Sequence, residues 1–202
     1  MSVSISKQNS KMGDIPSVSL PAGITCGNFP CYKDCYARKL ERLRPNVHES
    51  YERNYKILKE DPETFWREVE AQIMLSRFFR WHVSGDIPNK EYLNKMIEIA
   101  ERNKHCEMLC FTKKYDIVND AVESGMNIPE NLHLIFSAWR GLTMKNPHNF
   151  PEAHVKYRDG STTAASWAVP CNRYSGNCAM CASVDTGCWV LKNGEQVVFN
   201  QH

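Results

Sequence analysis

The sequence lacks the features that mark membrane, secreted and disordered proteins. Its 202 residues contain no apolar run of about 18 residues, so no transmembrane helix is expected. The N-terminal stretch MSVSISKQNSKMGDIPS is polar, which argues against a secretory signal peptide. Low-complexity segments and internal repeats are also lacking, and 42% hydrophobic with 24% charged residues is an ordinary globular composition. These absences predict a cytoplasmic protein with one sizeable core and no membrane partner.

An excess of charge of one sign is lacking as well. The chain carries 25 Lys and Arg against 23 Asp and Glu, a net charge of +2. A balance this small does not indicate a nucleic-acid partner. The main basic concentration is the run ARKLERLR at 37–44, in which Glu41 is interspersed. Such a run is typical of a solvated helix face, and it keeps nucleic acid open as an alternative partner.

Cysteine, by contrast, is abundant and unevenly distributed. The nine cysteines cannot all pair, and disulfides are rare in a reducing cytoplasm. Two segments hold most of them: Cys26, Cys31 and Cys35 lie early, and Cys171, Cys178, Cys181 and Cys188 lie late. Cysteines that serve only as small buried residues would be scattered more evenly. The clustering predicts metal ligation, whereas Cys106 and Cys110, which lie between the two groups, are expected to be inert, with a reserve ligand role as the alternative.

The cysteine spacings indicate which metals fit. They are C-x4-C-x3-C in the early group and C-x6-C-x2-C-x6-C in the late group, and thiolates this close converge on one centre. Soft donors select zinc or an iron–sulfur cluster over hard cations. Four late thiols satisfy either tetrahedral zinc or a 4Fe–4S cluster. Three early thiols leave one iron open or recruit a fourth ligand, for which Cys171 is the natural candidate. One or two 4Fe–4S clusters are therefore expected, with zinc as the alternative.

Apolar periodicity and capping residues predict the secondary structure. Asp61 is expected to cap a helix that begins at Pro62, and Asn89 to cap another. The helix that Asn89 caps is expected over 90–103, and further helices are expected over 36–44, 48–60 and 115–125. Strands are expected over 78–84, 107–112, 132–139 and 162–170. Strands that alternate with helices are typical of parallel βαβ units.

The expected fold is α/β, either a partial parallel (β/α) barrel or an open parallel sheet. This core is expected to span 1–170, and chemistry is expected at the carboxyl ends of its strands. The remaining segment, 171–202, is too rich in Cys, Gly, Ser and Asn to build a core by itself. We expect it to pack on the α/β core with a metal organising it.

The turn after the strand at 78–84 adds a second element to the early thiols. The turn is Ser84-Gly85-Asp86, a small residue, a glycine and an acid. With three cysteines in the loop before this strand, the chain resembles the radical S-adenosylmethionine enzymes, although each gap between the thiols is one residue longer than theirs. The resemblance implies a radical-SAM-like core in which the early thiols hold a 4Fe–4S cluster, Ser84, Gly85 and Asp86 line the S-adenosylmethionine pocket, and an electron donor is a partner.

A closer resemblance is to a family of phage and prophage proteins called gene product eighty-eight. The similar segments are NSKMG, LPAGITC, CYKDCYA, FRWHVSGDI and the cysteine-rich end followed by tryptophan. The match spans most of the chain. It implies a phage-related iron–sulfur protein and leaves the activity, the substrate and the oligomeric state open.

The function that the sequence predicts is redox or radical chemistry at an iron–sulfur centre, as in an oxidoreductase or lyase of radical-SAM-like type, with a small-molecule or macromolecular substrate. Whether the chain is an enzyme stays open, because two alternatives remain. One is a metal-stabilised module that binds nucleic acid or a host protein. The other is an iron–sulfur protein that transfers electrons or senses redox state without S-adenosylmethionine.

Two further features have both a structural and a functional interpretation. His82 follows Trp81 on an apolar strand and is expected to be a satisfied core histidine. Trp139-Arg140 ends the strongest predicted strand, where an aromatic plane and a guanidinium could hold an adenine or an anion, although Trp139 fits a core position equally.

Overall fold

The computed structural model describes residues 1–171 and 176–201, and one sheet organises them. Its eight strands lie in the order β1-β2-β3-β4-β5-β6-β8-β7. Their bounds are β1 (Ile5–Ser6), β2 (Ser17–Val18), β3 (Phe78–Trp81), β4 (Glu107–Thr112), β5 (Leu132–Ser137), β6 (Glu152–Lys156), β7 (Val169–Pro170) and β8 (Gln196–Asn200). All neighbours pair in parallel except β1 with β2. The fold is thus α/β with an open, mostly parallel sheet.

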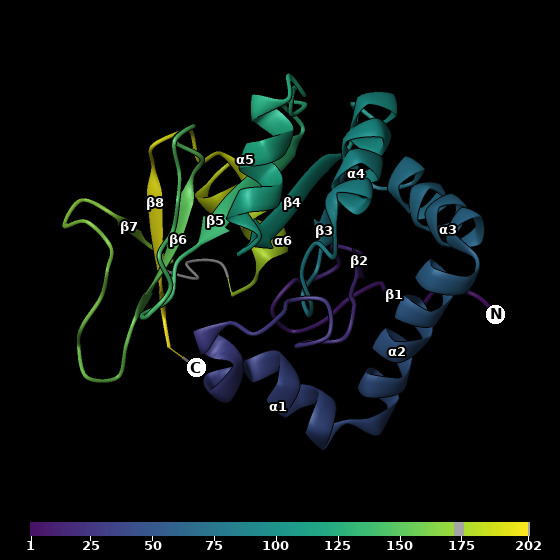
Figure 1. The fold of residues 1–202 in the computed structure, drawn as a ribbon, viewed down its shortest axis with the longest axis horizontal. Helices are drawn as coiled ribbons and strands as arrows, with labels where there is room; N and C mark the ends of the chain where they lie inside the picture. Colours follow the sequence, from purple (N-terminus) through teal and green to yellow (C-terminus); the bar gives the residue numbers. More distant parts are fainter. Residues whose placement is uncertain (172–175, 202) are drawn as a thin grey trace.

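Helices cover both faces of this sheet (Figure 1). They are η1 (Pro30–Asp34), α1 (Tyr36–Leu43), α2 (Pro45–Glu60), α3 (Pro62–Met74), α4 (Lys90–Arg102), α5 (Tyr115–Glu123), α6 (Cys178–Ser183) and η2 (Gly187–Trp189). The helices α4 and α5 cover one face, and the short α6 lies on the opposite face. In the view of Figure 1, α1 and α2 run below the sheet and along one side of it. None of the helices within the described residues combines the length and apolar character needed to cross a membrane.

Alternating side chains of the central strands build a core on each face. Met108 and Phe136 join the larger core with α3, α4 and α5. Their sequence neighbours Leu109 and Ile135 join a smaller core with Trp189 of η2 on the other face. Successive strand residues point to opposite faces, so both sides of the parallel sheet are apolar. The C-terminal segment therefore closes the face that the long helices leave open.

The two predicted helix caps are confirmed. The Asp61 side chain accepts a hydrogen bond from the Thr64 backbone N–H, and Pro62 is the first residue of α3. The Asn89 side chain accepts from the Tyr92 backbone N–H at the start of α4. These caps satisfy N–H groups that have no partner within the helix.

Several strand predictions were wrong in extent or missing. The strand expected at 78–84 ends at Trp81, because His82 has a positive φ of 56° and turns the chain. The strand expected at 162–170 is reduced to β7, whose two residues are exposed. The strand β8 was not predicted, although it pairs with β6 along five residues and separates it from β7.

Candidate functional site

The carboxyl ends of the central strands place several polar segments at one edge of the sheet. The chain leaves β2 into the loop that carries the early thiols and leaves β3 into Ser84-Gly85-Asp86. It leaves β4 at Lys113 and β5 after Ser137. Because the strands from β2 to β6 are parallel and adjacent in chain order, these segments converge. Sequence reasoning predicted this edge as the place for chemistry.

Asp86 is the best-anchored side chain at this edge. Its Oδ1 accepts hydrogen bonds from the Thr112 hydroxyl at 2.6 Å and the Ile87 N–H at 2.8 Å, and its Oδ2 accepts from the Lys113 N–H at 2.9 Å. Its own N–H donates to Thr25 Oγ1 at 3.1 Å. Burial raises the pKa of the carboxyl, and the three donors oppose that shift. Asp86 therefore ties the loop after β2 to the end of β4.

Ser84 is fixed in the same way through α1. Its hydroxyl donates to Glu41 Oε1 at 2.7 Å, and the same oxygen accepts from the Ala22 N–H at 3.0 Å. Glu41 is only 9% exposed, so the interpretation of this residue as part of a solvated helix face was wrong. The helical period turns Glu41 inward while its basic neighbours stay outside.

Gly85 is required by the close approach of two chain segments. Its φ is +82°, and a Cβ there would lie 2.7 Å from both the Leu20 carbonyl oxygen and Thr25 Oγ1. Gly125 has a similar φ of +87° with nothing within 4 Å, which makes it a matched control. We expect Gly85→Ala to lower the free energy of unfolding by about 3 kcal/mol and Gly125→Ala by about 1 kcal/mol in urea titrations. Equal losses would contradict the close approach.

The early thiols gather beside this turn. Burial raises the pKa of Cys26 to about 11, and the charges of Asp86, Cys35 and Cys31 add to the rise. Burial also raises the pKa of Cys31, and the ammonium of Lys113 is the largest effect that opposes it. Such mutual effects place the three thiols near one another, with one anion and one cation beside them. Lys113 is held by a 2.9 Å hydrogen bond to Ser137 Oγ.

The late thiols gather on the face of the sheet that carries the smaller core. Cys178 and Cys181 lie on α6, Cys188 lies on η2, and Cys171 follows β7 directly. All four pack against the smaller core. Burial raises the pKa of Cys188 to about 12, and the charges of Cys171, Cys178 and Cys181 contribute to this rise. The four thiols predicted to act together are thus brought together.

Neither group forms a ready coordination sphere. Within residues 1–171 and 176–201, no three His, Cys, Asp or Glu side chains are arranged so that they could hold a metal ion as they stand. The donor chemistry of each group nevertheless fits a soft metal, because half-buried thiols converge from short segments. Metal binding would draw the sulfurs closer and release their protons.

Arg80 is a site residue that sequence reasoning missed. It lies on β3, its side chain is 8% exposed, and its guanidinium is 4.2 Å from the centre of the Phe111 ring. Its Nε and Nη1 have no hydrogen-bond partner, and Nη2 makes one long contact of 3.5 Å with the His82 carbonyl oxygen. A lone arginine within the apolar run FFRWHV was the only sequence signal for it.

The comparisons with known proteins identify the family. The family model described as Gene product 88 matches residues 3–189. The chain belongs to the Gene product 88 family. The Gene 88 protein of Mycobacterium phage L5 is 27% identical over 145 residues, which cover 64% of this chain and 59% of that protein, so the chain spans less than two thirds of this relative. No solved structure matches. The expected relation to a phage protein family is confirmed.

The remaining sequence candidates of this Gene product 88 chain are engaged internally. His82 is 3% exposed and its Nε2 lies 3.0 Å from the Tyr92 hydroxyl, which agrees with a core histidine. Cys106 and Cys110 are fully buried. The Arg140 guanidinium stacks 3.6 Å from the Tyr157 ring centre and pairs with Asp159 at 3.1 Å. Arg140 is thus occupied by its own chain.

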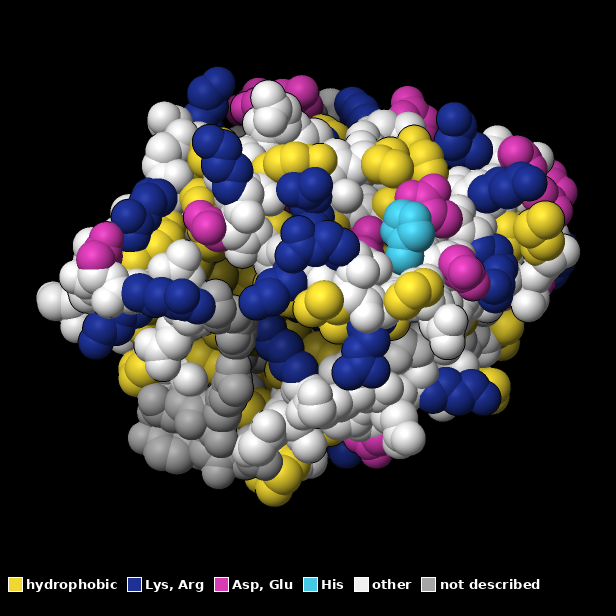
Figure 2. All heavy atoms as spheres, turned by 90° about the horizontal axis from the view of Figure 1, so that it is seen from below, with side chains coloured by type: hydrophobic (Ala, Val, Ile, Leu, Met, Phe, Trp, Pro, Cys, Tyr) yellow, Lys and Arg dark blue, Asp and Glu magenta, His cyan; other side chains and the backbone are white. Residues whose placement is uncertain are grey.

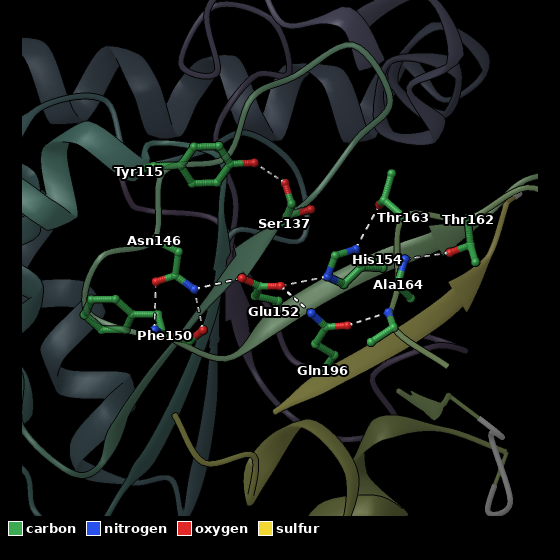
Figure 3. A network of polar contacts seen from close by, with 11 residues as sticks. Tyr115, Ser137, Asn146, Phe150, Glu152, His154, Thr162, Thr163, Ala164 and Gln196 are labelled. Atoms are coloured by element: carbon green, nitrogen blue, oxygen red, sulfur yellow. Dashed lines mark hydrogen bonds and ion pairs between the residues drawn. The ribbon is translucent and has the colours of Figure 1, made fainter. Parts of the chain in front are cut away.

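A partly buried polar network of the Gene product 88 chain also has a structural role (Figure 3). Glu152 Oε2 lies 2.9 Å from His154 Nε2, and His154 Nδ1 lies 2.9 Å from Thr163 Oγ1. Gln196 donates to Glu152 at 2.7 Å and accepts from the Ala165 N–H at 2.8 Å. These contacts bind the loop after β6 to both neighbouring strands, so the network rigidifies this part of the sheet.

Basic residues gather on the side of α1 and α2. Figure 2 views the molecule from that side and shows Lys and Arg side chains around a hollow floored by hydrophobic side chains. The exposed basic residues of this region include Lys33, Lys39, Arg42 and Arg44. With Glu41 buried, no carboxylate of α1 neutralises them. The exposed surface around α1 is therefore basic.

Proposed function

We propose that the chain is an iron–sulfur protein in which Cys26, Cys31 and Cys35 hold a 4Fe–4S cluster for radical chemistry on S-adenosylmethionine. The observation that carries this proposal is the position of the three thiols beside Asp86 and Lys113, at the carboxyl edge of strands that follow one another in chain order. A (β/α) barrel uses the same strand order and the same edge.

The side chains at this edge have separable roles in the proposal. Lys113 offsets negative charge on the thiolates, since it already lowers the pKa of Cys31. Asp86 Oδ2 accepts a single hydrogen bond and keeps capacity for the amino group of a bound S-adenosylmethionine. Ser84 is occupied by Glu41 and shapes the pocket through its position. Gly85 lets the backbone approach without a side chain in the way.

A cluster bound there would supply one electron to break the bond between the sulfur and the adenosyl carbon of S-adenosylmethionine. Methionine would leave, and a hydrogen atom taken from the substrate would complete 5′-deoxyadenosine. The electron must come from an external donor, as the sequence led us to expect. The late thiols would hold a second metal centre, a cluster or zinc.

The test is to purify the chain anaerobically, measure iron, sulfide and zinc, and add S-adenosylmethionine with dithionite. We expect about four iron and four sulfide for each cluster and the formation of 5′-deoxyadenosine, with a sample lacking dithionite as control. Zinc without sulfide would exclude the cluster. Iron and sulfide without 5′-deoxyadenosine would favour electron transfer or redox sensing. A metal-free chain that binds DNA or RNA with steep salt dependence would favour the binding module.

A further inference from the structure

The buried guanidinium of Arg80 has no counter-charge within residues 1–171 and 176–201. None of the ion pairs among the described residues includes Arg80. Two of its nitrogens are buried without a hydrogen-bond partner. A buried charge that is neither paired nor hydrogen-bonded is strongly unfavourable, so such groups are normally matched by an anion. This feature points to an anionic group that binds against Arg80.

The position of Arg80 shows where that anion would lie. Phe78 and Phe111 pack with the smaller core, and Arg80 shares their face because it is two residues after Phe78 and stacks on Phe111. This is the face that α6 and η2 cover. The guanidinium therefore lies in the layer between the sheet and the cysteine-rich segment.

All four late thiols pack against this same smaller core. Burial raises the pKa of Cys178, and Arg80 is the largest effect that lowers it; Arg80 also acts on Cys188. Lys11 is a second cation near Cys178. Four thiolates on Zn²⁺ or on a 4Fe–4S core carry a net negative charge, which is what an uncompensated guanidinium requires.

We propose that Arg80 is the counter-ion of a metal–thiolate centre formed by Cys171, Cys178, Cys181 and Cys188, with Nε and Nη1 donating to its sulfur atoms. The inference rests on the proposed function only in taking the late thiols as metal ligands. Arg80 is then a positioning residue that stabilises the centre. If the centre is a cluster, Arg80 also favours its reduced state, because reduction adds negative charge.

The experiment compares Arg80→Met, which keeps bulk without charge, with Arg80→Lys, which keeps the charge, in full-length protein. Arg77→Met, an exposed arginine near the start of the same strand, is the matched control. For a cluster, we expect Arg80→Met to lower the midpoint in a dithionite titration followed by electron paramagnetic resonance. The expected shift is tenfold in the one-electron equilibrium constant, about 59 mV. For zinc, we expect release to a chromogenic chelator to become at least tenfold faster. Arg80→Lys should retain most of the wild-type value in either case.

The outcomes separate this inference from the proposed function. A loaded late centre whose midpoint or zinc release is the same in Arg80→Met as in wild type would overturn the counter-ion role alone. Equal damage in Arg80→Met and Arg80→Lys would also overturn it, because the charge would then not matter. Zinc at the late thiols with no cluster at the early ones would defeat the proposed function and leave Arg80 testable by zinc release. A wild-type chain without metal at the late thiols would overturn the counter-ion role and leave the cluster proposed at the early thiols standing.

Discussion

Serine in place of Cys26, Cys31 and Cys35 together is expected to remove one whole cluster, about four iron and four sulfide, from each chain. Serine keeps the size of cysteine but replaces a soft sulfur with a hard oxygen that ligates iron–sulfur clusters poorly. The late thiols pack against the smaller core, whereas the early thiols lie in the loop after β2, so the late thiols are expected to keep their metal. Metal and sulfide analysis of the purified variant measures both effects.

Controls for this variant come from the remaining cysteines. Cys106 and Cys110 are buried in the larger core, and alanine at both is expected to leave the metal content unchanged at a modest cost in stability. Serine at the four late cysteines is expected to give the reciprocal loss. If the triple variant lost the metal of both groups, a shared ligand such as Cys171 would be indicated. If it kept all its iron, the assignment of the early thiols would be wrong.

The second large effect is acid destabilisation through His82. Burial, aided by the Arg80 charge, lowers the pKa of His82 from 6.5 to about 3, so the folded chain keeps this imidazole neutral. The unfolded chain binds the proton below about pH 6.5, so this contribution to stability is complete above that pH and is lost as the pH falls toward about 3. We expect the group to account for about 3 kcal/mol of the free energy of unfolding lost between about pH 7 and pH 4.

His82→Asn isolates that contribution. Asparagine tolerates the positive φ of 56° at this position and does not titrate. The variant loses the contact with Tyr92 and is expected to be less stable at neutral pH, but its stability should fall less steeply with acid. Urea titrations at both pH values give the two slopes. Parallel pH dependence in wild type and variant would show that His82 is not the group responsible.

Local chemistry explains which parts of the fold were predictable. Asp61 and Asn89 begin helices through contacts within a few residues, so the sequence around them is sufficient. The strands β2 and β7 have two residues each and exist only through distant partners. The strand β8 is amphipathic and short, and its pairing with β6 depends on the loop that delivers it. Pairing of that kind is set by tertiary context.

The same distinction applies to the candidate site. The two groups of thiols could be predicted because residues close together in the sequence are also close together in space. Arg80 was not, because its burial depends on a cover supplied by α6 and η2, which lie about 100 residues further along the chain. Glu41 was misread because its partner Ser84 comes from another element and lies far away in sequence. Burial of a polar side chain by a distant segment leaves no local pattern.

The insertion of β8 between β6 and β7 has a consequence for biosynthesis. Among the described strands, β7 pairs with β8 alone, and Cys171 donates its N–H to the Val198 carbonyl oxygen at 2.7 Å. The start of the late thiol segment is thus fixed only when residues 196–200 have left the ribosome. The early thiols have all their neighbouring strands long before that point. Under the proposed function, the early centre would form before β8 has been synthesised, and the late centre only after β8 has paired with β6 and β7.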